Sequence, residues 1–491
     1  MATDPLRIAI VGGGIAGLAA AWEWVPLLQR GRVRVTVLES RDRFGGLIRT
    51  DRRSGLVIEG GPDSFLARKP EARELCRAVG LGEHLIGTRP DIRGAYIYHH
   101  GRLHPIPAGM QAGIPSDLGP LVRSGLLSPW GKFRASWDLW LPRVLPRDGR
   151  DVSVGWFLRR RFGEEVVVRL AEPMLSGIYA ADIDQLSLAA TFPRLAEIEH
   201  RSRSLILGLS RSGPPAPARD PASPPPSLFQ TLDTGLDTLI DTLVARLTAA
   251  GAELLRGHPV ESISREGRGY RLGLAGGSGR SFEGVILATP AYVTARLLGA
   301  LDPRLGALHD RIPYSSLAVV GLGYAPEAIP RPLDKTGYLI PRDSGFSTTA
   351  VTWLSAKWRH RHQSELVPLR AFLGRTGGPD VAELDDQGLL GLALHDLAAT
   401  MGLTAAPAYH VLFRWRRALP QYLVGHVERV REIRERLQAW PGLAVAGAAY
   451  DGPGVPDCIA SARTAVAAVA GALGMQTAGT PGPAAGSPRG L

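Results

Sequence analysis

Three glycines near the amino terminus have the spacing of a turn that binds a dinucleotide. Gly12, Gly14 and Gly17 form G-x-G-x-x-G directly after the apolar run at residues 8–11, and Glu39 follows Gly17 by 22 residues. The first glycine permits a tight turn, the second lets the backbone approach a pyrophosphate, and the third lets a helix pack on a strand. A carboxylate about 20 residues further on binds ribose hydroxyls. These residues predict a site for FAD or NAD, because an acid at this place disfavours the 2′-phosphate of NADP.

The elements around these glycines must hold them at the end of a parallel strand. Residues 8–11 predict a buried strand, residues 18–28 a helix, and residues 33–38 a second strand. The helix would direct its free N–H groups and its positive dipole end at the phosphates. A structural glycine turn is the alternative, but the strand, helix, strand and acid in one unit favour the nucleotide. No second G-x-G-x-x-G opens a helix, so a separate NAD(P) domain is not expected.

A second glycine loop follows the acid. Arg43, Gly45 and Gly46 form R-x-G-G, and adjacent glycines let a backbone lie against a ligand without a Cβ clash. A plain surface turn is the alternative. The position just after Glu39 favours a second loop that contacts the cofactor, in which Arg43 could serve the pyrophosphate with bidentate geometry.

Length and composition predict a globular protein of two or three domains. The chain has 491 residues, 45% of them hydrophobic and 21% charged. The net charge of +11 suits an anionic ligand or an anionic membrane face. Nucleic acid is a poor alternative, because the arginines are scattered and no Lys/Arg block has interleaved aromatics. Cys76 and Cys458 form no C-x-x-C, which excludes a redox dithiol and a Cys-rich metal site and fits a reducing compartment. No 18-residue apolar run exists to cross a membrane.

An aromatic stripe and a pair of basic residues each allow two interpretations. One face of a predicted helix carries the aromatic and apolar residues Trp130, Phe133, Trp137, Trp140 and Leu141. Ordinary core packing is the default for such a stripe, and a basic, Trp-rich amphipathic helix also suits a membrane surface. Lys69 and Arg73 lie at the start of a helix that is predicted from Pro70 to about Val79. They form either a solvated basic turn or part of a site for an acidic ligand.

The remaining segments predict a return to the first sheet and a second sheet. A strand at residues 285–288 would rejoin the nucleotide-binding sheet, and residues 311–435 hold strand-like runs and at least two helices. A helix beginning near Val455 would aim its positive end at a buried ligand. The Pro/Ala/Ser-rich segment 211–227 and the tail 475–491 are predicted to be disordered.

Seven motifs occur together over nearly the whole chain. They are VGGGIAGLAAA, the R-x-GG loop, EGGPDSFLARK, EPMLSGIYAAD-x-x-x-LS, RSRSLILG, RWxxALPQYxxGH and GPGVPDCIxSA. Together they resemble the FAD-dependent protoporphyrinogen IX and coproporphyrinogen III oxidases of bacterial haem biosynthesis, within the amine-oxidase-like flavoproteins. The resemblance implies an α/β (mixed α+β) fold with three parts: a discontinuous Rossmann-like FAD-binding domain (1–50, 77–105, 228–298, 436–474), a mixed-sheet substrate-binding domain (51–76, 171–210, 299–435) and a helical membrane-association domain (106–170).

The resemblance also assigns roles to residues of this chain. Residues expected to hold FAD are Gly12, Gly14, Ile15, Ala16, Gly17, Glu39, Ser40, Arg43, Gly45, Gly46, Val260, Ala288, Gly447 and Val455. Val260 would contact the adenine end by its backbone, and Val455 the isoalloxazine. Residues expected to bind substrate are Lys69, Arg73, Gly177, Ile178 and Tyr179; Lys69 matches a propionate-binding lysine of bacterial members. No catalytic side chain and no metal ligand is expected.

The implied reaction is the removal of six electrons from a porphyrinogen, with oxygen as acceptor and H2O2 as product. The segments LARK and RSRSLILG favour coproporphyrinogen III, and protoporphyrinogen IX is the alternative. The implied partners are the tetrapyrrole, O2, an anionic membrane surface and the next haem-pathway enzyme; the implied location is the cytoplasm, peripheral on the inner face of the cell membrane. The rival functions are another oxidase or desaturase of the superfamily, acting on amines or carotenoids, and a non-catalytic flavin-binding peripheral membrane protein.

Overall fold

A computed structural model describes residues 4–476 except 112, 212–226, 360–363 and 377–379. The segments expected to be disordered, 211–227 and 475–491, fall outside the described residues except at their ends. Among the described residues, no helix is long and apolar enough to cross a membrane.

A five-stranded parallel sheet carries the first glycine motif. In spatial order its strands are β12 (Glu253–Arg256), β2 (Val33–Glu39), β1 (Leu6–Val11), β16 (Gly284–Leu287) and β22 (Leu443–Val445). Ile8 pairs with Val35 on one side and Gly284 on the other. An all-parallel sheet is covered on both faces, which explains the continuous apolar run of β1. The predicted return of residues 285–288 to this sheet is confirmed by β16.

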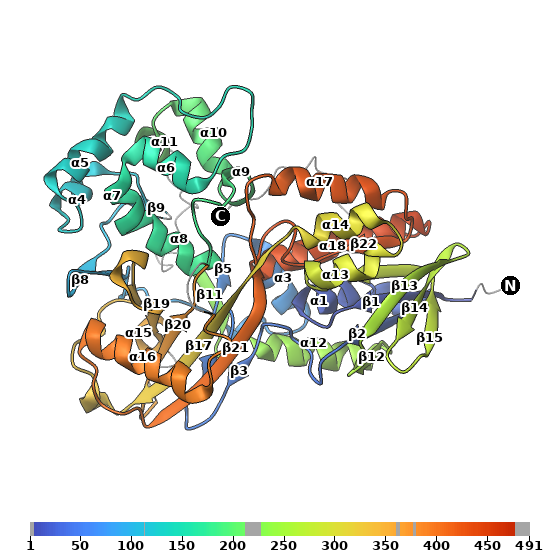
Figure 1. Ribbon diagram of the computed structural model, residues 1–491. Helices are drawn as coiled ribbons and strands as arrows, with labels where there is room; N and C mark the ends of the chain where they lie inside the picture. Colours follow the sequence, from blue (N-terminus) through green and yellow to red (C-terminus); the bar gives the residue numbers. More distant parts are fainter. Residues whose placement is uncertain (1–3, 112, 212–226, 360–363, 377–379, 477–491) are drawn as a thin grey trace.

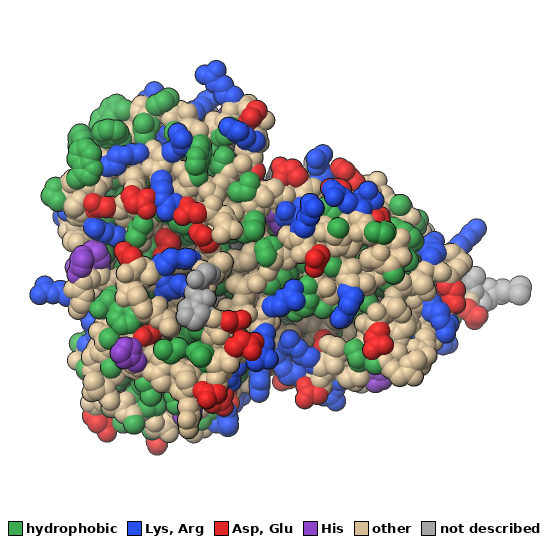
Figure 2. Space-filling view, in the orientation of Figure 1, with side chains coloured by type: hydrophobic (Ala, Val, Ile, Leu, Met, Phe, Trp, Pro, Cys, Tyr) green, Lys and Arg blue, Asp and Glu red, His purple; other side chains and the backbone are tan. Residues whose placement is uncertain are grey.

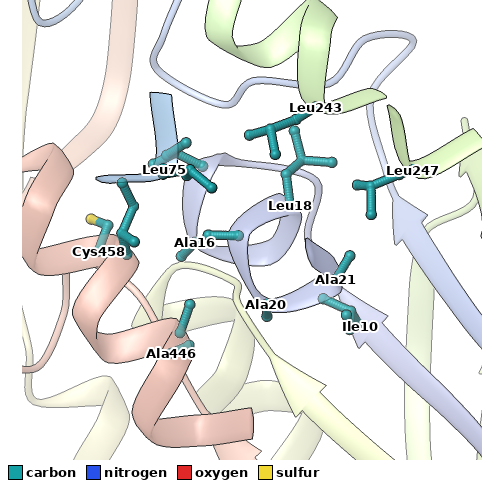
Figure 3. Packing of buried hydrophobic residues seen from close by; sticks show 14 of the residues in the cluster. Ile10, Ala16, Leu18, Ala20, Ala21, Leu75, Leu243, Leu247, Ala446 and Cys458 are labelled. Carbon is teal, nitrogen blue, oxygen red and sulfur yellow. The ribbon is translucent and has the colours of Figure 1, made fainter. Parts of the chain in front are cut away.

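Helices and a small antiparallel sheet cover the two faces. One face packs against α1 (Ile15–Glu23), α3 (Pro70–Ala78), α12 (Asp237–Ala249) and α18 (Val455–Ala472), and Figure 3 shows Leu18, Leu243, Leu75 and Cys458 meeting there. The other face packs against β13 (Val260–Glu266), β14 (Gly269–Leu274), β15 (Gly279–Phe282), α13 (Ala291–Gly299), α14 (Pro303–Asp310) and α17 (His426–Leu437). The helix predicted at 18–28 is divided into α1 and α2 (Val25–Gln29), because Pro26 cannot donate within a continuous helix.

A seven-stranded mixed sheet forms the second layer of strands. Its spatial order is β21 (Tyr409–Pro420), β17 (Tyr314–Tyr324), β20 (Val367–Leu373), β19 (Thr348–Trp353), β18 (Gly337–Leu339), β7 (Tyr96–His99) and β8 (Arg102–Pro105). All neighbours are antiparallel except β18 and β7. The helices α15 (Leu354–Lys357) and α16 (Asp386–Met401) pack on it. Figure 1 shows β21 leading from this sheet to α17 beside the parallel sheet.

A helical part with its own apolar core completes the molecule. It contains α4 (Leu118–Arg123), α5 (Pro129–Ser136), η2 (Trp137–Leu139), α6 (Val154–Phe162), α7 (Glu164–Val166), the π-turn η3 (Val167–Ala171), α8 (Glu172–Tyr179), α9 (Leu188–Thr191), α10 (Pro193–Ser202) and α11 (Leu205–Arg211). The remaining short elements are β3 (Thr50–Asp51), β4 (Ile58–Glu59), β5 (Phe65–Leu66), η1 (Gly82–His84), β6 (Leu85–Gly87), β9 (Met110–Gln111), β10 (Ile114–Pro115), β11 (Phe229–Leu232), η4 (Pro326–Ala328), η5 (Arg342–Ser344).

The grouping of elements differs from the expected domain boundaries in three places. Residues 77–105 were assigned to FAD binding, but β7 and β8 extend the mixed sheet. Residues 51–76 were assigned to substrate binding, but α3 buries Ala72 and Leu75 in the core beside the parallel sheet. The helical part continues past residue 170 through α11, because α8 to α11 share one apolar core with α6. The other boundaries stay predictions.

The aromatic stripe lies on the outside of the helical part. Trp130, Phe133, Trp137 and Trp140 are 64%, 55%, 39% and 69% exposed, and the predicted helix ends at Ser136. The interpretation of these four residues as core is therefore wrong. The core of this part is built from other side chains, such as Phe157 and Leu158 of α6.

The segment between β21 and α17 joins all three parts. Tyr422 packs in the helical core and its hydroxyl donates to the Ala448 carbonyl after β22. The ring of His426 stacks on Tyr422 at a centroid distance of 4.0 Å, and its Nε2 lies 3.3 Å from the Tyr450 carbonyl. Burial lowers the pKa of His426 to about 4, although the carbonyl contact works against this.

The buried neutral His426 predicts a specific acid sensitivity. The pKa of His426 is about 4 in the folded protein and about 6.5 in the unfolded chain. As pH falls from about 6.5 to about 4, the unfolded chain therefore binds a proton that the folded protein does not. The free energy of unfolding falls over this window by about 3 kcal/mol in total. Urea unfolding of His426→Gln should show a shallower loss between pH 6.5 and 4. The exposed variant His410→Gln should keep the wild-type slope, and equal slopes for all three proteins would contradict this account.

Candidate functional site

Backbones from three segments meet at the carboxyl end of the parallel sheet. Gly12 follows β1 with φ +107°, and a Cβ there would lie 2.6 Å from the Ala288 carbonyl oxygen after β16. A Cβ on Gly17 would lie 1.8 Å from the Gly12 oxygen. The N–H of Gly45 donates to the Gly13 carbonyl at 2.8 Å. The two close approaches explain why positions 12 and 17 are glycines.

Gly14 differs from its neighbours because no atom of the described residues would crowd a Cβ at this position. The nearest atom to a Cβ at Gly14 would be Gly46 Cα, at 3.9 Å. Gly14 precedes α1, and within the described chain no side chain caps that helix. Free N–H groups at a helix start form an anion site. An uncrowded glycine at this place fits a cofactor pyrophosphate that approaches the backbone.

Glu39 ends β2 beside this turn and keeps hydrogen-bonding capacity. Its Oε2 accepts the N–H of Gly13 at 2.6 Å, and its Oε1 accepts the N–H of Arg41 at 2.9 Å and the Ser40 hydroxyl at 3.3 Å. A carboxylate has about four acceptor sites, so room remains for ribose hydroxyls. The N–H of His258 donates to the Glu39 carbonyl at 2.9 Å. This bond brings the start of β13, where Val260 lies, to the side of Glu39.

Arg43 organises its own loop. Its guanidinium donates to the carbonyls of Phe44 at 3.1 Å and Ile48 at 3.3 Å, and also to that of Gly46. It also lies over the Trp415 ring, 5.9 Å from the centroid. The expected contact of Arg43 with the pyrophosphate stays a prediction, whereas its role in shaping the R-x-GG loop follows from these bonds.

The start of α18 faces the start of α1. Gly447 follows β22, lies next to Ala16 and donates its N–H to Ser461 of α18 at 3.1 Å. Val455 is the first residue of α18 and is buried. Figure 3 shows Ala16, Ala446 and Cys458 on these adjoining segments. The remaining predicted cofactor residue, Ile15, begins α1, so the predicted cofactor residues follow or adjoin β1, β2, β16 and β22 at one edge of the sheet.

Lys69 forms a buried ion pair with Asp457, which lies in the first turn of α18. Its Nζ lies 2.7 Å from Oδ1 of Asp457, and the two side chains are 12% and 10% exposed. Burial raises the pKa of Asp457, and the ammonium of Lys69 offsets this in part. The interpretation of Lys69 as a solvated basic turn is therefore wrong.

Further cations lie on the segment around Lys69 and on α10. Arg73, on α3, is half-buried. Burial and the charge of Arg194, on α10, lower the pKa of Arg68. Arg68 and Arg194 were missed by the sequence reasoning, as was Asp457. Asp457 carried a signal, because an acid in the first turn of a helix interacts with the dipole, but its partner lies 388 residues away.

The other predicted substrate residues lie on a different element. Residues 177–179 end α8, and their side chains are outside the described part of the structure. The helix α8 packs against β18 and β19 of the mixed sheet. Ala180 follows it with φ +47°, and its carbonyl accepts the Thr376 hydroxyl at 2.7 Å. The predicted substrate site thus draws on α3 and on the helical part.

The segment EGGPDSF, residues 59–65, is bound to the mixed sheet by hydrogen bonds and ion pairs. Trp415 donates its Nε1–H to the Gly60 carbonyl and Arg370 donates to that of Gly61, both at 2.6 Å. Asp63 meets Lys357 at 2.8 Å and Arg370 at 3.3 Å. Burial would raise the pKa of Asp63, but the two cations outweigh it and hold that pKa well below its usual range.

Two other features are separate from these residues. An open cavity of about 580 Å³ lies beside α15 and η4, lined by Arg89, Arg331 and Ser355 among others, and none of the predicted site residues lines it. Burial raises the pKa of both Cys76 and Cys458 to about 12, so neither supplies a thiolate nucleophile at neutral pH.

Comparison with known proteins decides the family. The model of the flavin-containing amine oxidoreductases matches residues 15–470. The chain belongs to this family. Membership in the flavin-containing amine oxidoreductases implies FAD as the cofactor, and the open Gly14 and the acceptor capacity of Glu39 fit that group.

Several relatives in this family cover almost the whole chain. The chain is 38% identical over 469 residues to the coproporphyrinogen III oxidase of Bacillus subtilis, covering 95% of this chain and 98% of that one. It is 30% identical over 492 residues to the chloroplastic protoporphyrinogen oxidase of Nicotiana tabacum, covering 95% and 86%.

Solved structures share the fold of this chain. One from Exiguobacterium, named provisionally as a protoporphyrinogen oxidase, superposes with a TM-score of 0.84 at 35% identity, covering 96% of this chain and all of that one. Wild-type putrescine oxidase, at 17% identity and a TM-score of 0.64 over 94% of this chain and 98% of that one, shares the fold alone. The expected α/β architecture, with a parallel Rossmann-like sheet and a mixed sheet, is confirmed.

The contrast between Gly14 and Gly17 yields a prediction. Gly14→Ala should fold with wild-type stability as the FAD-free protein but bind FAD about tenfold more weakly, because its Cβ occupies only the cofactor's space. Gly17→Ala should lower the Tm of the FAD-free protein, because overpacking costs about 1–3 kcal/mol. Thermal unfolding of both FAD-free variants and titration with FAD measure this. Wild-type FAD affinity in Gly14→Ala would contradict it.

Proposed function

We propose that this protein oxidises a porphyrinogen, coproporphyrinogen III or protoporphyrinogen IX, to the porphyrin in haem biosynthesis. The observation that carries the proposal is the 38% identity to a coproporphyrinogen III oxidase over 95% of the chain. Coproporphyrinogen III is favoured, since further relatives of that name match at 33–35% over at least 93% of the chain. Six electrons leave the substrate and three O2 become three H2O2.

The chain's own residues bind and orient the substrate in this proposal. The chemistry that FAD supplies when bound is the acceptance of hydride and the return of electrons to O2. The ammonium of Lys69 binds a propionate of the macrocycle through a charge-assisted hydrogen bond. Arg73, Arg68 and Arg194 add positive charge nearby. Residues 177–179 of α8 are the other residues that the proposal assigns to binding the macrocycle. No acid–base side chain is required of the protein.

A direct assay separates this function from its rivals. Anaerobic coproporphyrinogen III or protoporphyrinogen IX should bleach the yellow holoenzyme, and oxygen should restore the colour with formation of H2O2. Peroxide formed with an amine but not with a porphyrinogen would indicate another oxidase of the family. A flavin that no porphyrinogen bleaches would indicate a non-catalytic protein.

The substitution Lys69→Met should change KM and leave kcat nearly unchanged. KM for the porphyrinogen should rise about tenfold and kcat should stay within about twofold, because propionate binding is mostly ground-state binding. Steady-state peroxide assays measure both constants. Arg77→Met, at an exposed position on the same helix, should leave KM unchanged. An unchanged KM in Lys69→Met would remove Lys69 from the site.

We also propose that the helical part associates with an anionic membrane surface at the inner face of the cell membrane. Trp130, Phe133 and Trp140 are all more than half exposed. Figure 2 shows hydrophobic side chains, with Lys and Arg among them, over the region of α4 and α5. Aromatic side chains beside basic ones suit the boundary between lipid headgroups and acyl chains.

Vesicle binding tests the membrane proposal. The double variant Trp130→Ser/Trp140→Ser should bind anionic vesicles about tenfold more weakly, because it loses apolar area for the interface, and its activity in detergent should be unchanged. Co-sedimentation with vesicles measures this. Leu228→Ser removes a comparably exposed side chain, 59% exposed, and should bind like the wild type. Equal binding by all three proteins would overturn the proposal.

A further inference from the structure

The ion pair of Lys69 and Asp457 places an internal carboxylate where the proposed substrate delivers its own. Lys69 is the residue just before α3, and Asp457 is the third residue of α18. The distance of 2.7 Å and the burial of both side chains leave the pair little water. A second carboxylate that reaches the same ammonium must therefore come close to Asp457.

The backbone around Asp457 holds its carboxylate in place. A Cβ on Gly452 would lie 2.6 Å from Asp457 Cγ, and one on Gly454 would lie 2.8 Å from Asp457 Oδ2. Glycines at both positions thus let the chain wrap the carboxylate. The backbone of Gly454 also hydrogen-bonds it. Asp457 cannot swing away when another anion arrives, so it stays as a competitor for the ammonium.

If the Lys69–Asp457 pair were purely structural, its role would be to link α3 to α18. Another ion pair already links these two helices. Arg463 of α18 bonds to Glu74 of α3 at 3.0 Å and to Glu23 of α1 at 3.0 Å. Glu74 is exposed. This second pair joins the same two helices away from the buried pair, which supplies a matched control for a purely structural link.

We propose that Asp457 is the internal counter-ion of Lys69 and sets the affinity for the substrate's carboxylate by competing with it. The carboxylate neutralises the ammonium while no substrate is bound, and its repulsion weakens binding of a second carboxylate so that the porphyrin product is released. Asp457 acts through Lys69 and is a specificity-determining, positioning residue. The inference rests on the proposed function, because it takes the ligand to be a tetrapyrrole carboxylate.

The neutral variant Asp457→Asn isolates the charge. Its amide oxygen can still accept a hydrogen bond from Lys69, while the repulsion is gone. Like charges a few ångströms apart in a partly dry site repel strongly, so the FAD-loaded variant should bind coproporphyrin III about tenfold more tightly. KM for coproporphyrinogen III should fall with it. Fluorescence titration of the porphyrin measures the affinity.

A double-mutant cycle shows whether Asp457 acts through Lys69. In Lys69→Met the buried Asp457 loses its cation and burial favours its neutral form. Adding Asp457→Asn to Lys69→Met should then change the affinity less than about twofold. The control Glu74→Gln should keep the wild-type affinity. An affinity that is unchanged or weaker in Asp457→Asn, or tighter in Glu74→Gln, overturns the proposal.

Two further measurements keep the proposal decidable. If Asp457→Asn does not fold, Lys69→Arg serves instead: its fork can bind both oxygens of Asp457, so coproporphyrin III should bind more weakly although the positive charge is kept. Wild-type or tighter binding would overturn the proposal. A wild-type protein that neither binds coproporphyrin III nor oxidises coproporphyrinogen III refutes the proposed function instead.

Discussion

The close approach of backbones at the carboxyl edge of the parallel sheet is the constraint on which the rest depends. Gly12, Gly17 and Ala288 lie so near one another that no side chain fits between them. This contact fixes α1 on β1, and Glu39 holds the same turn by accepting the N–H of Gly13. The shape of the carboxyl edge of the parallel sheet, where FAD is expected to bind, is therefore set by steric exclusion within the protein itself.

The substrate side relies on charge. Lys69 directly precedes α3, Asp457 lies on α18 and Arg194 lies on α10, so these charged groups come from both the parallel-sheet part and the helical part. Asp63 is held by Lys357 and Arg370 of the mixed-sheet part. Charged groups from distant segments of the chain are thus paired only in the folded protein. Small movements between them would change the field that an acidic ligand meets.

Local patterns predicted the strands and helices around the glycine motifs, and contacts between distant residues limited the other predictions. The glycines, the two strands, Glu39 and the helix at Val455 have local signals, and each element is present. The partner of Lys69 lies on another helix 388 residues away, which no spacing rule reveals. Periodicity placed the tryptophans on one face but could not say whether protein covers it. For Arg43, the residue type was compatible with pyrophosphate or carbonyls, and the structure shows only the bonds to its own loop.

The strand order of the parallel sheet also bears on how the protein is made. Its first two strands are complete by residue 39, but β16 and β22 arrive only at residues 284–287 and 443–445. The ribosome must therefore synthesise almost the entire polypeptide before the five-stranded parallel sheet can be completed. FAD capture becomes a late event of biogenesis, and prematurely terminated chains are left with an open sheet edge that chaperones or proteases must handle.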